Sequence, residues 1–337
     1  MRGLAMSPNS ARQKSTIVRS SHMRIAVLRA AFTTLDRLSP ALASRWALRI
    51  WCTLPSNSGR RQDNRPYPGR LSTVRLRDGR EVAVETWLPV ASDDNVPDRP
   101  VHAPAPPVHA PTPSVSTSGR PVYLVHGWGG WRGQLGAFVE PLLQAGYRVV
   151  AFDVPSHGDS SPSAIGRGRA TALDFTDALA AVVAEHGEPG GIVAHSLGAA
   201  TTVRTVRDGL GTPRMVFVAP SPDPIATLWK LQQALGYGPR THERLLGRLE
   251  RLAGRPLDDF NAFLVDSEDA VPPAMIAHDR QDKESPYQDG VRLARTWPDA
   301  ELVTTSDLGH QRILLDESVL KLAVDYLTTT PAPPDPE

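Results

Sequence analysis

The stretch VAHSLGAA, residues 193–200, places a serine between apolar residues of strand type and a helical pattern. Ala194 and Gly198 lie two positions before and two positions after Ser196. Both are small enough to permit a tight strand-to-helix turn that lifts the serine hydroxyl above a sheet. The pattern departs from G-x-S-x-G, because Ala194 stands where the first glycine would be. Ser196 is therefore either a nucleophile or one hydroxyl on an ordinary turn.

The region that begins at residue 121 alternates apolar runs of strand length with helical segments. The apolar runs lie at 121–125, 147–152, 191–194, 215–219, 274–278 and 300–304, and the helical segments lie near 134–145, 170–186, 197–208, 287–296 and 316–327. Short apolar strands that alternate with helices predict a parallel sheet buried on both faces. Right-handed crossovers make this a doubly wound, mostly parallel α/β sheet, with its active site outside the carboxyl ends of the strands.

The main domain is predicted to span residues 71–330, followed by a disordered tail at 331–337. Its first part, 72–89, alternates apolar and polar residues around Asp78-Gly79, which predicts a hairpin with a two-residue turn. A Pro-rich loop is predicted at 89–119. His102 and His109 lie within it, but the other ligands of a metal site are missing. A helical cap is predicted at 220–265, because the chain between two strands is unusually long there.

The N-terminal region differs in charge from the rest of the chain. Residues 1–70 hold 13 Arg and Lys against two acidic residues, whereas the remainder holds 24 against 34. We expect a disordered basic tail at 1–22 and an amphipathic helical arm at 23–70, broken at Ser39-Pro40. The arm is expected to pack on its own domain. Peripheral membrane contact is the alternative, and nucleic acid is not expected because no binding motif is present.

Cysteine usage and hydropathy suggest the compartment. Cys52 is the single cysteine, which excludes an internal disulfide and suits a reducing environment. No run of 18 apolar residues predicts a spanning helix, and the N-terminus lacks the apolar core of a signal peptide, although Met23 could be an alternative start. We therefore expect a cytoplasmic protein, peripheral to the membrane only if the arm binds there. The oligomeric state stays open.

Two later strands of the predicted sheet also run into polar clusters. Residues 274–278 lead into HDRQD, which contains Asp279 and Asp282, and residues 300–304 lead into SDLGHQ, which contains His310. A serine nucleophile needs a base to take its proton and a third group to hold that base. A serine, an acid and a histidine in this chain order, each after its own strand, favour acyl chemistry. The residues alone leave both aspartates as candidates for the acid.

Five motifs in one order, HGWGG, FDVPSHGDS, AHSLGA, HDRQD and LGH, make residues 72 to about 328 resemble the α/β-hydrolase family, of the serine type with a helical cap. The resemblance implies a triad of Ser196, Asp282 and His310. Asp282 matches the aspartate of the family pattern H-G-x-x-D, and Asp279 occupies its glycine position and remains a rival.

The resemblance also implies an oxyanion hole and several structural residues. The backbone N–H groups of Trp128 and Leu197 would hold the oxyanion. Orienting or turn-forming roles, with no part in the chemistry, are implied for His126, His157, His195 and Asp153.

The expected function is hydrolysis of a carboxylic ester or thioester through an acyl-enzyme, with a small-molecule acyl substrate and with neither a cofactor nor a metal. Trp131, Trp229 and Tyr237 are candidates for the lining of an apolar acyl pocket. Two alternatives stay open, an acyltransferase on the same triad and a non-catalytic binding protein with a hydrolase-like shell. Nucleotide-dependent oxidoreduction is excluded, because no G-x-G-x-x-G follows the first parallel strand.

Overall fold

A computed structural model describes residues 25–55, 62–89, 119–264 and 271–329. The chain forms two compact units. The first, here the helical unit, comprises Met1–Thr53 and Asp223–Asn261, and the second, here the sheet unit, comprises Leu54–Pro222 and Ala262–Glu337. The predicted tails at 1–22 and 331–337, and the Pro-rich loop apart from its ends, lie outside the described residues.

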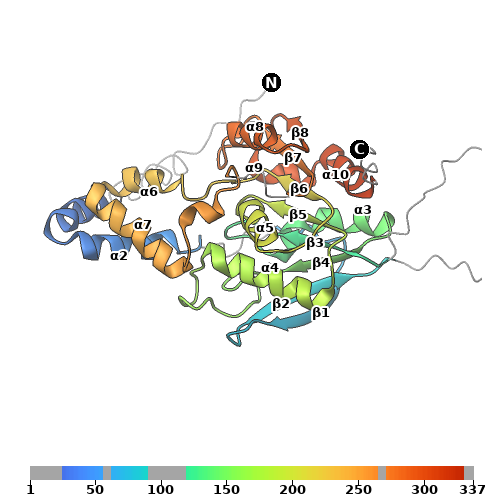
Figure 1. The fold of residues 1–337 in the computed structure, drawn as a ribbon, viewed down its shortest axis with the longest axis horizontal. Helices are drawn as coiled ribbons and strands as arrows, with labels where there is room; N and C mark the ends of the chain where they lie inside the picture. The colour runs from blue at the N-terminus through green and yellow to red at the C-terminus, as the bar shows by residue number, and fades with distance from the viewer. Residues whose placement is uncertain (1–24, 56–61, 90–118, 265–270, 330–337) are drawn as a thin grey trace, which may run out of the picture. The chain divides into compact units, whose positions relative to one another are not determined.

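The sheet unit is built on one eight-stranded sheet with the order β1-β2-β4-β3-β5-β6-β7-β8 (Figure 1). The strands are β1 (Arg70–Arg75), β2 (Glu81–Trp87), β3 (Pro121–Val125), β4 (Arg148–Phe152), β5 (Gly191–His195), β6 (Met215–Val218), β7 (Ala274–Asp279) and β8 (Ala300–Thr305). β2 pairs antiparallel with both β1 and β4, and all other pairs are parallel. The predicted mostly parallel α/β sheet is confirmed.

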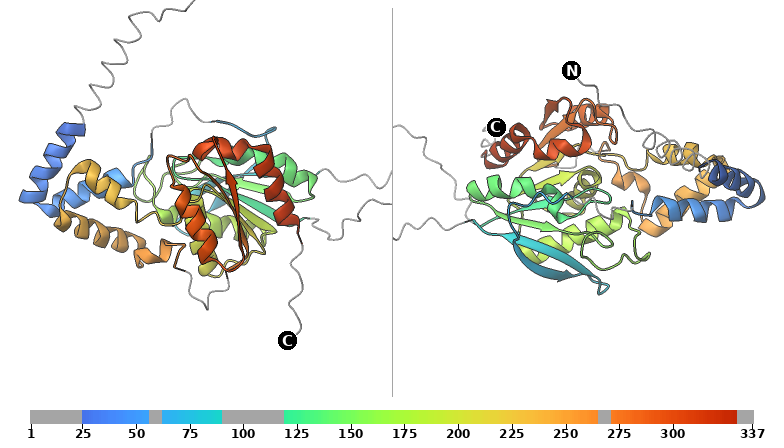
Figure 2. Two further views of the ribbon diagram at one scale, coloured as in Figure 1. Left: turned by 90° about the horizontal axis from the view of Figure 1, so that it is seen from above. Right: turned by 180° about the vertical axis from the view of Figure 1, so that it is seen from behind.

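Helices cover both faces of this sheet. One face packs against α4 (Ala172–His186), α5 (Leu197–Arg207) and α8 (Tyr287–Thr296), and the other packs against η1 (Arg132–Phe138), α3 (Val139–Gln144) and α10 (Glu317–Thr328). Figure 2 (left) shows α8 and α10 on opposite sides of the strands. The doubly wound arrangement is thus confirmed.

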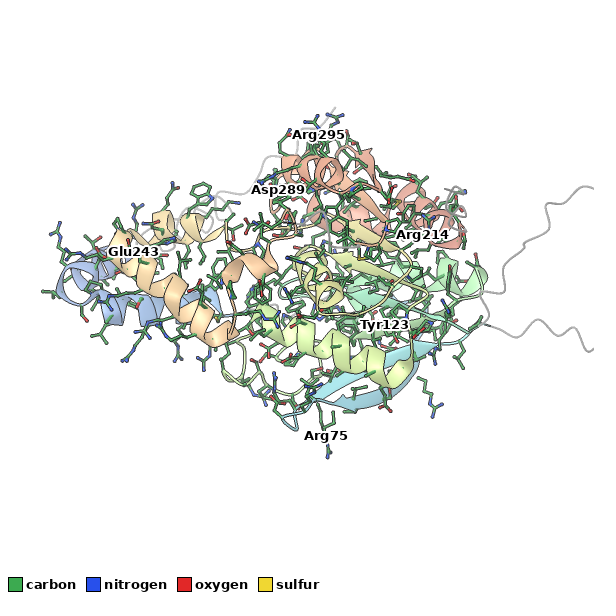
Figure 3. The ribbon with its side chains drawn as sticks, viewed as in Figure 1. Arg75, Tyr123, Arg214, Glu243, Asp289 and Arg295 are labelled. Atoms are coloured by element: carbon green, nitrogen blue, oxygen red, sulfur yellow. The ribbon has the colours of Figure 1, made fainter. Side chains whose placement is uncertain are left out.

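The side chains of β3 illustrate why the strand sequences are continuously apolar. Tyr123 and Val125 point into the core on the α4 side, whereas Val122 and Leu124 point into the core on the α3 side. Alternate residues of a strand face opposite sides, so a strand covered on both faces must be apolar throughout. Tyr123 (Figure 3) satisfies its one polar atom by donating a hydrogen bond of 2.5 Å to the Gly187 carbonyl.

The predicted hairpin is present as β1 and β2, but its predicted two-residue turn is wrong. The Leu76 N–H donates to the Arg80 carbonyl at 2.8 Å, so three residues form the loop, and the Gly79 N–H donates to the Leu76 carbonyl at 2.9 Å. Gly79 has φ +86°, whereas Asp78 keeps a negative φ. One left-handed glycine after an ordinary turn is the geometry of a three-residue hairpin loop.

The helical unit contains the helix at 25–38, α2 (Pro40–Trp51), α6 (Leu228–Leu235), α7 (Pro239–Ala253) and η2 (Leu257–Phe260). Ser39 caps α2 by accepting a hydrogen bond from the Leu42 N–H, and Pro40 follows it, which explains the predicted break. Phe32 stacks on Trp46 at 4.6 Å. The N-terminal arm and the cap insertion, which the sequence presents as separate segments, therefore share one apolar core. No helix in the described ranges is long and apolar enough to cross a membrane.

Candidate active site

Ser196 lies at the turn between β5 and α5, where it adopts φ 54° and ψ −121°. A positive φ is rare for a residue other than glycine and costs about 1–3 kcal/mol, so the surrounding structure must hold it. The Ser196 N–H donates to the Val218 carbonyl at 3.2 Å, and its carbonyl accepts from Ser221 at 3.0 Å. A Cβ on Gly127 would lie 2.8 Å from the Ser196 Cβ. The loop after β3 therefore packs directly on the serine.

Asp282 and His310 meet at the same edge of the sheet. Asp282 follows β7, and His310 lies in the short helix α9 (Gly309–Arg312) after β8. His310 Nδ1 donates to Asp282 Oδ2 at 2.7 Å, and Asp282 Oδ1 accepts from the backbone N–H groups of Glu284 and Ser285 at 2.8 and 3.0 Å. Burial alone would raise the pKa of Asp282, but hydrogen bonds from His278 and His310 outweigh it and hold that pKa well below its usual range.

Asp279, the rival acid, is engaged elsewhere. Its Oδ2 accepts from the Leu308 N–H at 3.0 Å and from the Thr305 hydroxyl at 2.9 Å, and its Oδ1 accepts from the Gln281 N–H at 2.9 Å. These bonds tie the end of β7 to the loop after β8. The structure thus brings Asp282 to the imidazole and uses Asp279 to shape the loop that carries the histidine.

Two buried histidines hold the loop that follows β3. His126 Nε2 accepts from the Val154 N–H at 3.1 Å, and His157 Nε2 accepts from the Gly129 N–H at 3.1 Å. Because Nε2 accepts, each ring carries its proton on Nδ1, which faces a backbone carbonyl, that of Gly127 at 2.8 Å and that of Pro155 at 3.1 Å, respectively. Burial and then the neighbouring His126 lower the pKa of His157 to about 3, so it stays neutral.

The predicted oxyanion donors are both unengaged. Among the hydrogen bonds of the described residues, none is donated by the backbone N–H of Trp128 or of Leu197. Leu197 is the first residue of α5, where the N–H groups have no partner within the helix. Donors of this kind at a helix start suit a developing negative charge.

Residues 122–323 match the α/β-hydrolase family. This chain belongs to that family. No curated protein matches its sequence. The esterase from Thermogutta terrifontis (18% identity, TM-score 0.51) and the esterase from Exiguobacterium antarcticum (13%, 0.52) each align with 77% of this chain and with 98% and 99% of their own. Bromoperoxidase from Bacillus anthracis aligns similarly (15%, TM-score 0.51, 77% and 99%), so these likenesses establish the fold of the hydrolase and leave its activity to the site.

His195 links the turn at Ser196 of this hydrolase to His310. Its Nε2 donates to the His310 carbonyl at 3.0 Å, and the two rings are 4.7 Å apart. Burial, followed by the neighbouring His310, lowers the pKa of His195 to about 3, so the ring is neutral. In the described structure Ser196 Oγ makes no hydrogen bond with His310. Contacts of this kind often tighten only in the substrate complex.

Sequence reasoning missed the part played by His278, the residue four positions before Asp282. His278 is fully buried, and its Nε2 lies 3.4 Å from Asp282 Oδ2 and 3.2 Å from the Ser285 carbonyl. A Cβ on Gly290 of α8 would lie 2.4 Å from His278 Nδ1, so the glycine makes room for the ring. The only signal in the sequence was its i, i+4 spacing to Asp282.

The three aromatic residues predicted to line an acyl pocket lie in different units, Trp131 in the sheet unit and Trp229 and Tyr237 in the helical unit. Trp131 Nε1 donates to the Gln62 carbonyl at 3.1 Å, with the Arg65 guanidinium 4.9 Å from its ring centre. Trp229 is half exposed on α6, and Tyr237 is buried in the helical unit 6.0 Å from the Phe32 ring. Their pocket roles stay predictions.

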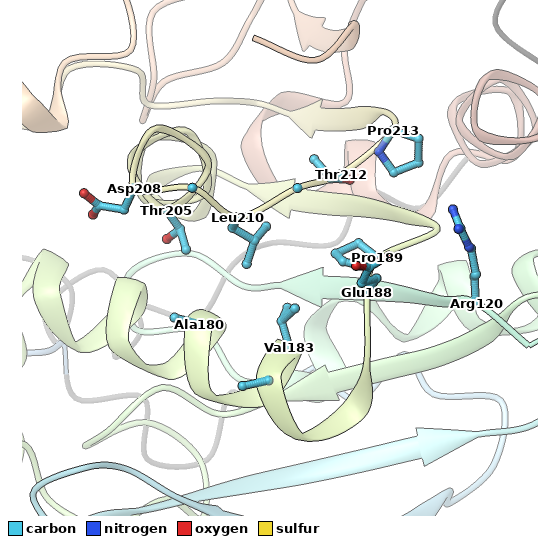
Figure 4. A pocket seen from close by; sticks show the side chains of 13 residues that line it. Arg120, Ala180, Val183, Glu188, Pro189, Thr205, Asp208, Leu210, Thr212 and Pro213 are labelled. Carbon is cyan, nitrogen blue, oxygen red and sulfur yellow. The ribbon is translucent and has the colours of Figure 1, made fainter. Parts of the chain in front are cut away.

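Two hollows of the sheet unit differ in their relation to the site. His310 lines a pocket of about 480 Å³ together with Lys283 and Glu284, and Glu284 Oε2 lies 3.9 Å from His310 Nε2. A second pocket, of about 560 Å³, lies between α4 and α5 beside the residues that precede β3, β5 and β6 (Figure 4). It is at the amino ends of the strands, where this fold does not place its chemistry. Within the described ranges, no cluster of three or more His, Cys, Asp or Glu could hold a metal.

Proposed function

We propose that this hydrolase is a serine enzyme that cleaves a carboxylic ester or thioester through an acyl-enzyme. The observation that carries the proposal is the 2.7 Å contact between His310 and Asp282 at the sheet edge where Ser196 is held in a strained turn. Two backbone N–H groups without a partner in the described structure belong to neighbouring residues. Leu197 follows Ser196 in the chain, and Trp128 follows Gly127, which packs against Ser196. Base, acid, nucleophile and oxyanion donors are thus the parts that acyl transfer requires.

The first half of the reaction follows from the protonation of these groups. Asp282 accepts a hydrogen bond from His310 Nδ1–H, which leaves Nε2 as the ring atom that can take a proton. As Ser196 Oγ attacks the substrate carbonyl carbon, its proton moves to His310 Nε2, and the ionised Asp282 stabilises the imidazolium. The N–H groups of Trp128 and Leu197 hold the oxyanion, each worth about 3–4 kcal/mol in the transition state.

The second half regenerates the enzyme. Collapse of the tetrahedral intermediate breaks the bond to the alcohol or thiol, and His310 gives that leaving group its proton. Water then attacks the acyl-enzyme while His310 takes one of its protons, and the carboxylic acid leaves as Ser196 recovers its hydrogen. No cofactor takes part in these steps.

Two measurements on the full chain test the proposal. A fluorophosphonate probe is expected to label the wild type and to leave Ser196→Ala unlabelled. A series of p-nitrophenyl esters is expected to show turnover of short to medium acyl chains by the wild type alone. Turnover that persists in Ser196→Ala, or labelling at another serine, would reject the triad. Turnover restricted to long-chain esters would reject the expected acyl-chain preference.

We also propose that the protein works in the cytoplasm. Its single cysteine, Cys52, is a buried thiol, as a reducing compartment permits. Fractionation of cells that express the full chain tests this location. Recovery in an extracellular fraction would contradict it.

A further inference from the structure

Two packed helices of the helical unit carry arginines that have no acidic partner. Arg45 on α2 and Arg244, Arg248 and Arg251 on α7 form no ion pair with any residue in the described part of the chain. We call these four residues the arginine face. The three members on α7 are spaced i, i+4 and i+7, so they lie along one side of that helix.

The arginine face brings like charges close together. Arg248 of α7 reaches α2, where its Nε donates to the Ser44 hydroxyl at 2.9 Å and its Nη2 donates to the Ala41 carbonyl at 3.3 Å. Ser44 is the neighbour of Arg45. Burial first, and then the positive charges of the other three arginines, lower the pKa of Arg248. Repulsion of this kind is relieved by an anionic ligand.

Two arginines of the sheet unit are arranged in the opposite way. Arg132 contacts Glu85, Asp153 and Asp159, and Arg80 contacts Asp78 and Asp174. In these two cases carboxylates within the sheet unit balance the charge of the guanidinium group. The arginine face has no such carboxylate among the described residues, so its positive charge is available to an anionic ligand.

Two exposed leucines lie close to Arg45 in the chain. Leu42 is 51% exposed and precedes Arg45 by three residues on the same side of α2, and Leu38, at the end of the preceding helix, is 78% exposed. Arg49 continues this side one turn further on and is exposed. Nucleic acid and free phosphate would use the arginines but not the leucines. The surface of an anionic bilayer offers charged headgroups and an apolar layer beneath them.

We propose that the arginine face, together with Leu38 and Leu42, binds the surface of an anionic lipid bilayer. The guanidinium groups would contact headgroup phosphates and carboxylates, and the two leucines would enter the headgroup boundary. The binding is independent of the proposed esterase activity, because none of these residues belongs to the triad. It would bring the enzyme to a membrane without a spanning helix.

Sedimentation of the full chain with lipid vesicles tests this inference. The wild type should pellet with phosphatidylcholine vesicles that contain phosphatidylserine, should stay in solution with pure phosphatidylcholine, and should be released by salt. The variant Arg45→Gln/Arg244→Gln/Arg251→Gln keeps Arg248 and its contacts with α2. Its affinity should fall by at least about tenfold, because each Lys or Arg near an anionic bilayer contributes about fivefold.

A matched variant removes the same charge elsewhere. Arg75→Gln/Arg77→Gln/Arg295→Gln alters three exposed arginines of the sheet unit, two of which are labelled in Figure 3. It should bind vesicles like the wild type, and Leu42→Ser should bind more weakly than the wild type. Circular dichroism establishes that each variant is folded. Equal losses in the two triple variants, equal binding to pure phosphatidylcholine, or binding to an oligonucleotide but not to vesicles would each overturn the inference.

Discussion

His310 and Asp282 form a 2.7 Å hydrogen bond between residues that follow two different strands. Asp282 Oδ2, which accepts this bond, also lies 3.4 Å from His278 Nε2, and its Oδ1 accepts two backbone N–H groups. Both oxygens of the carboxylate therefore have hydrogen-bond partners before any substrate binds. A fixed, ionised acid keeps the imidazole in the tautomer that can serve as a base.

Replacement of Asp282 by Asn should remove activity without removing the fold. We expect kcat for a p-nitrophenyl ester to fall by roughly three to four orders of magnitude, with little change in KM, because the imidazole loses its orienting acceptor. Steady-state kinetics measure both constants. Asp279→Asn is the matched control, which should lower the melting temperature and keep kcat within about tenfold, since Asp279 contacts the loop instead of the imidazole. The reverse pattern would make Asp279 the acid.

His278 should act through Asp282. The variant His278→Phe lacks a donor to the buried carboxylate of Asp282. We therefore expect its free energy of unfolding to be about 2 kcal/mol lower, and its kcat to be lower at unchanged KM. His278→Gln retains an N–H donor and should restore part of both losses. Urea unfolding and steady-state kinetics of the wild type and the two variants measure these losses. Identical kinetics in the Phe and Gln variants would limit His278 to packing.

Two neutral, buried histidines should make stability depend on pH. The folded pKa values of His157 and His195 are about 3, below the unfolded value of 6.5. The unfolded chain therefore binds more protons between these values, so the free energy of unfolding is complete above pH 6.5 and decreases as the pH falls toward 3. When the pH falls from 7 to 5, each histidine should lower the free energy of unfolding by about 2 kcal/mol.

Denaturant unfolding at the two pH values measures this slope. The variant His157→Gln keeps an acceptor for the Gly129 N–H and should lose about half of the pH dependence. A slope that stays the same in this variant would show that His157 does not contribute to it.

Gly198 should not tolerate a side chain. A Cβ there would lie 2.8 Å from the carbonyl oxygens of Val125 and His126, which are backbone atoms that cannot move aside cheaply. Gly198→Ala should cost about 1–3 kcal/mol of stability and greatly slow fluorophosphonate labelling of Ser196, because the loop after β3 must shift. Gly211→Ala, which meets no atom within 4 Å, is the control. Wild-type labelling in Gly198→Ala would show that the loop position is not critical.

Some residues of the candidate site could be predicted from their neighbours in the sequence, and others only from contacts between distant segments. The turn at Ser196 was readable because the strand before it, the helix after it and Gly198 are all close in sequence. The choice between Asp282 and Asp279 could not be made from spacing, since Asp279 ends β7 and Asp282 follows it by only three residues. The position of the loop after β8 distinguishes the two aspartates, because the Leu308 N–H donates to Asp279 whereas the His310 imidazole donates to Asp282.

The helical unit shows the same limit at a larger scale. The periodicity of the arm predicts its helices and the break at Ser39-Pro40, but no local pattern indicates that α2 shares a core with α7, some two hundred residues away along the chain.

The sequence by itself determined the strands and helices of the sheet unit, their mostly parallel arrangement and the three strand ends near which Ser196, Asp282 and His310 lie, because these follow from hydrophobic periodicity and short-range turn geometry. Only the tertiary structure decided which carboxylate holds His310, that His278 supports it, that the hairpin loop has three residues, and that arm and cap form one unit. Most of these depend on contacts between distant segments, which no local window of sequence contains.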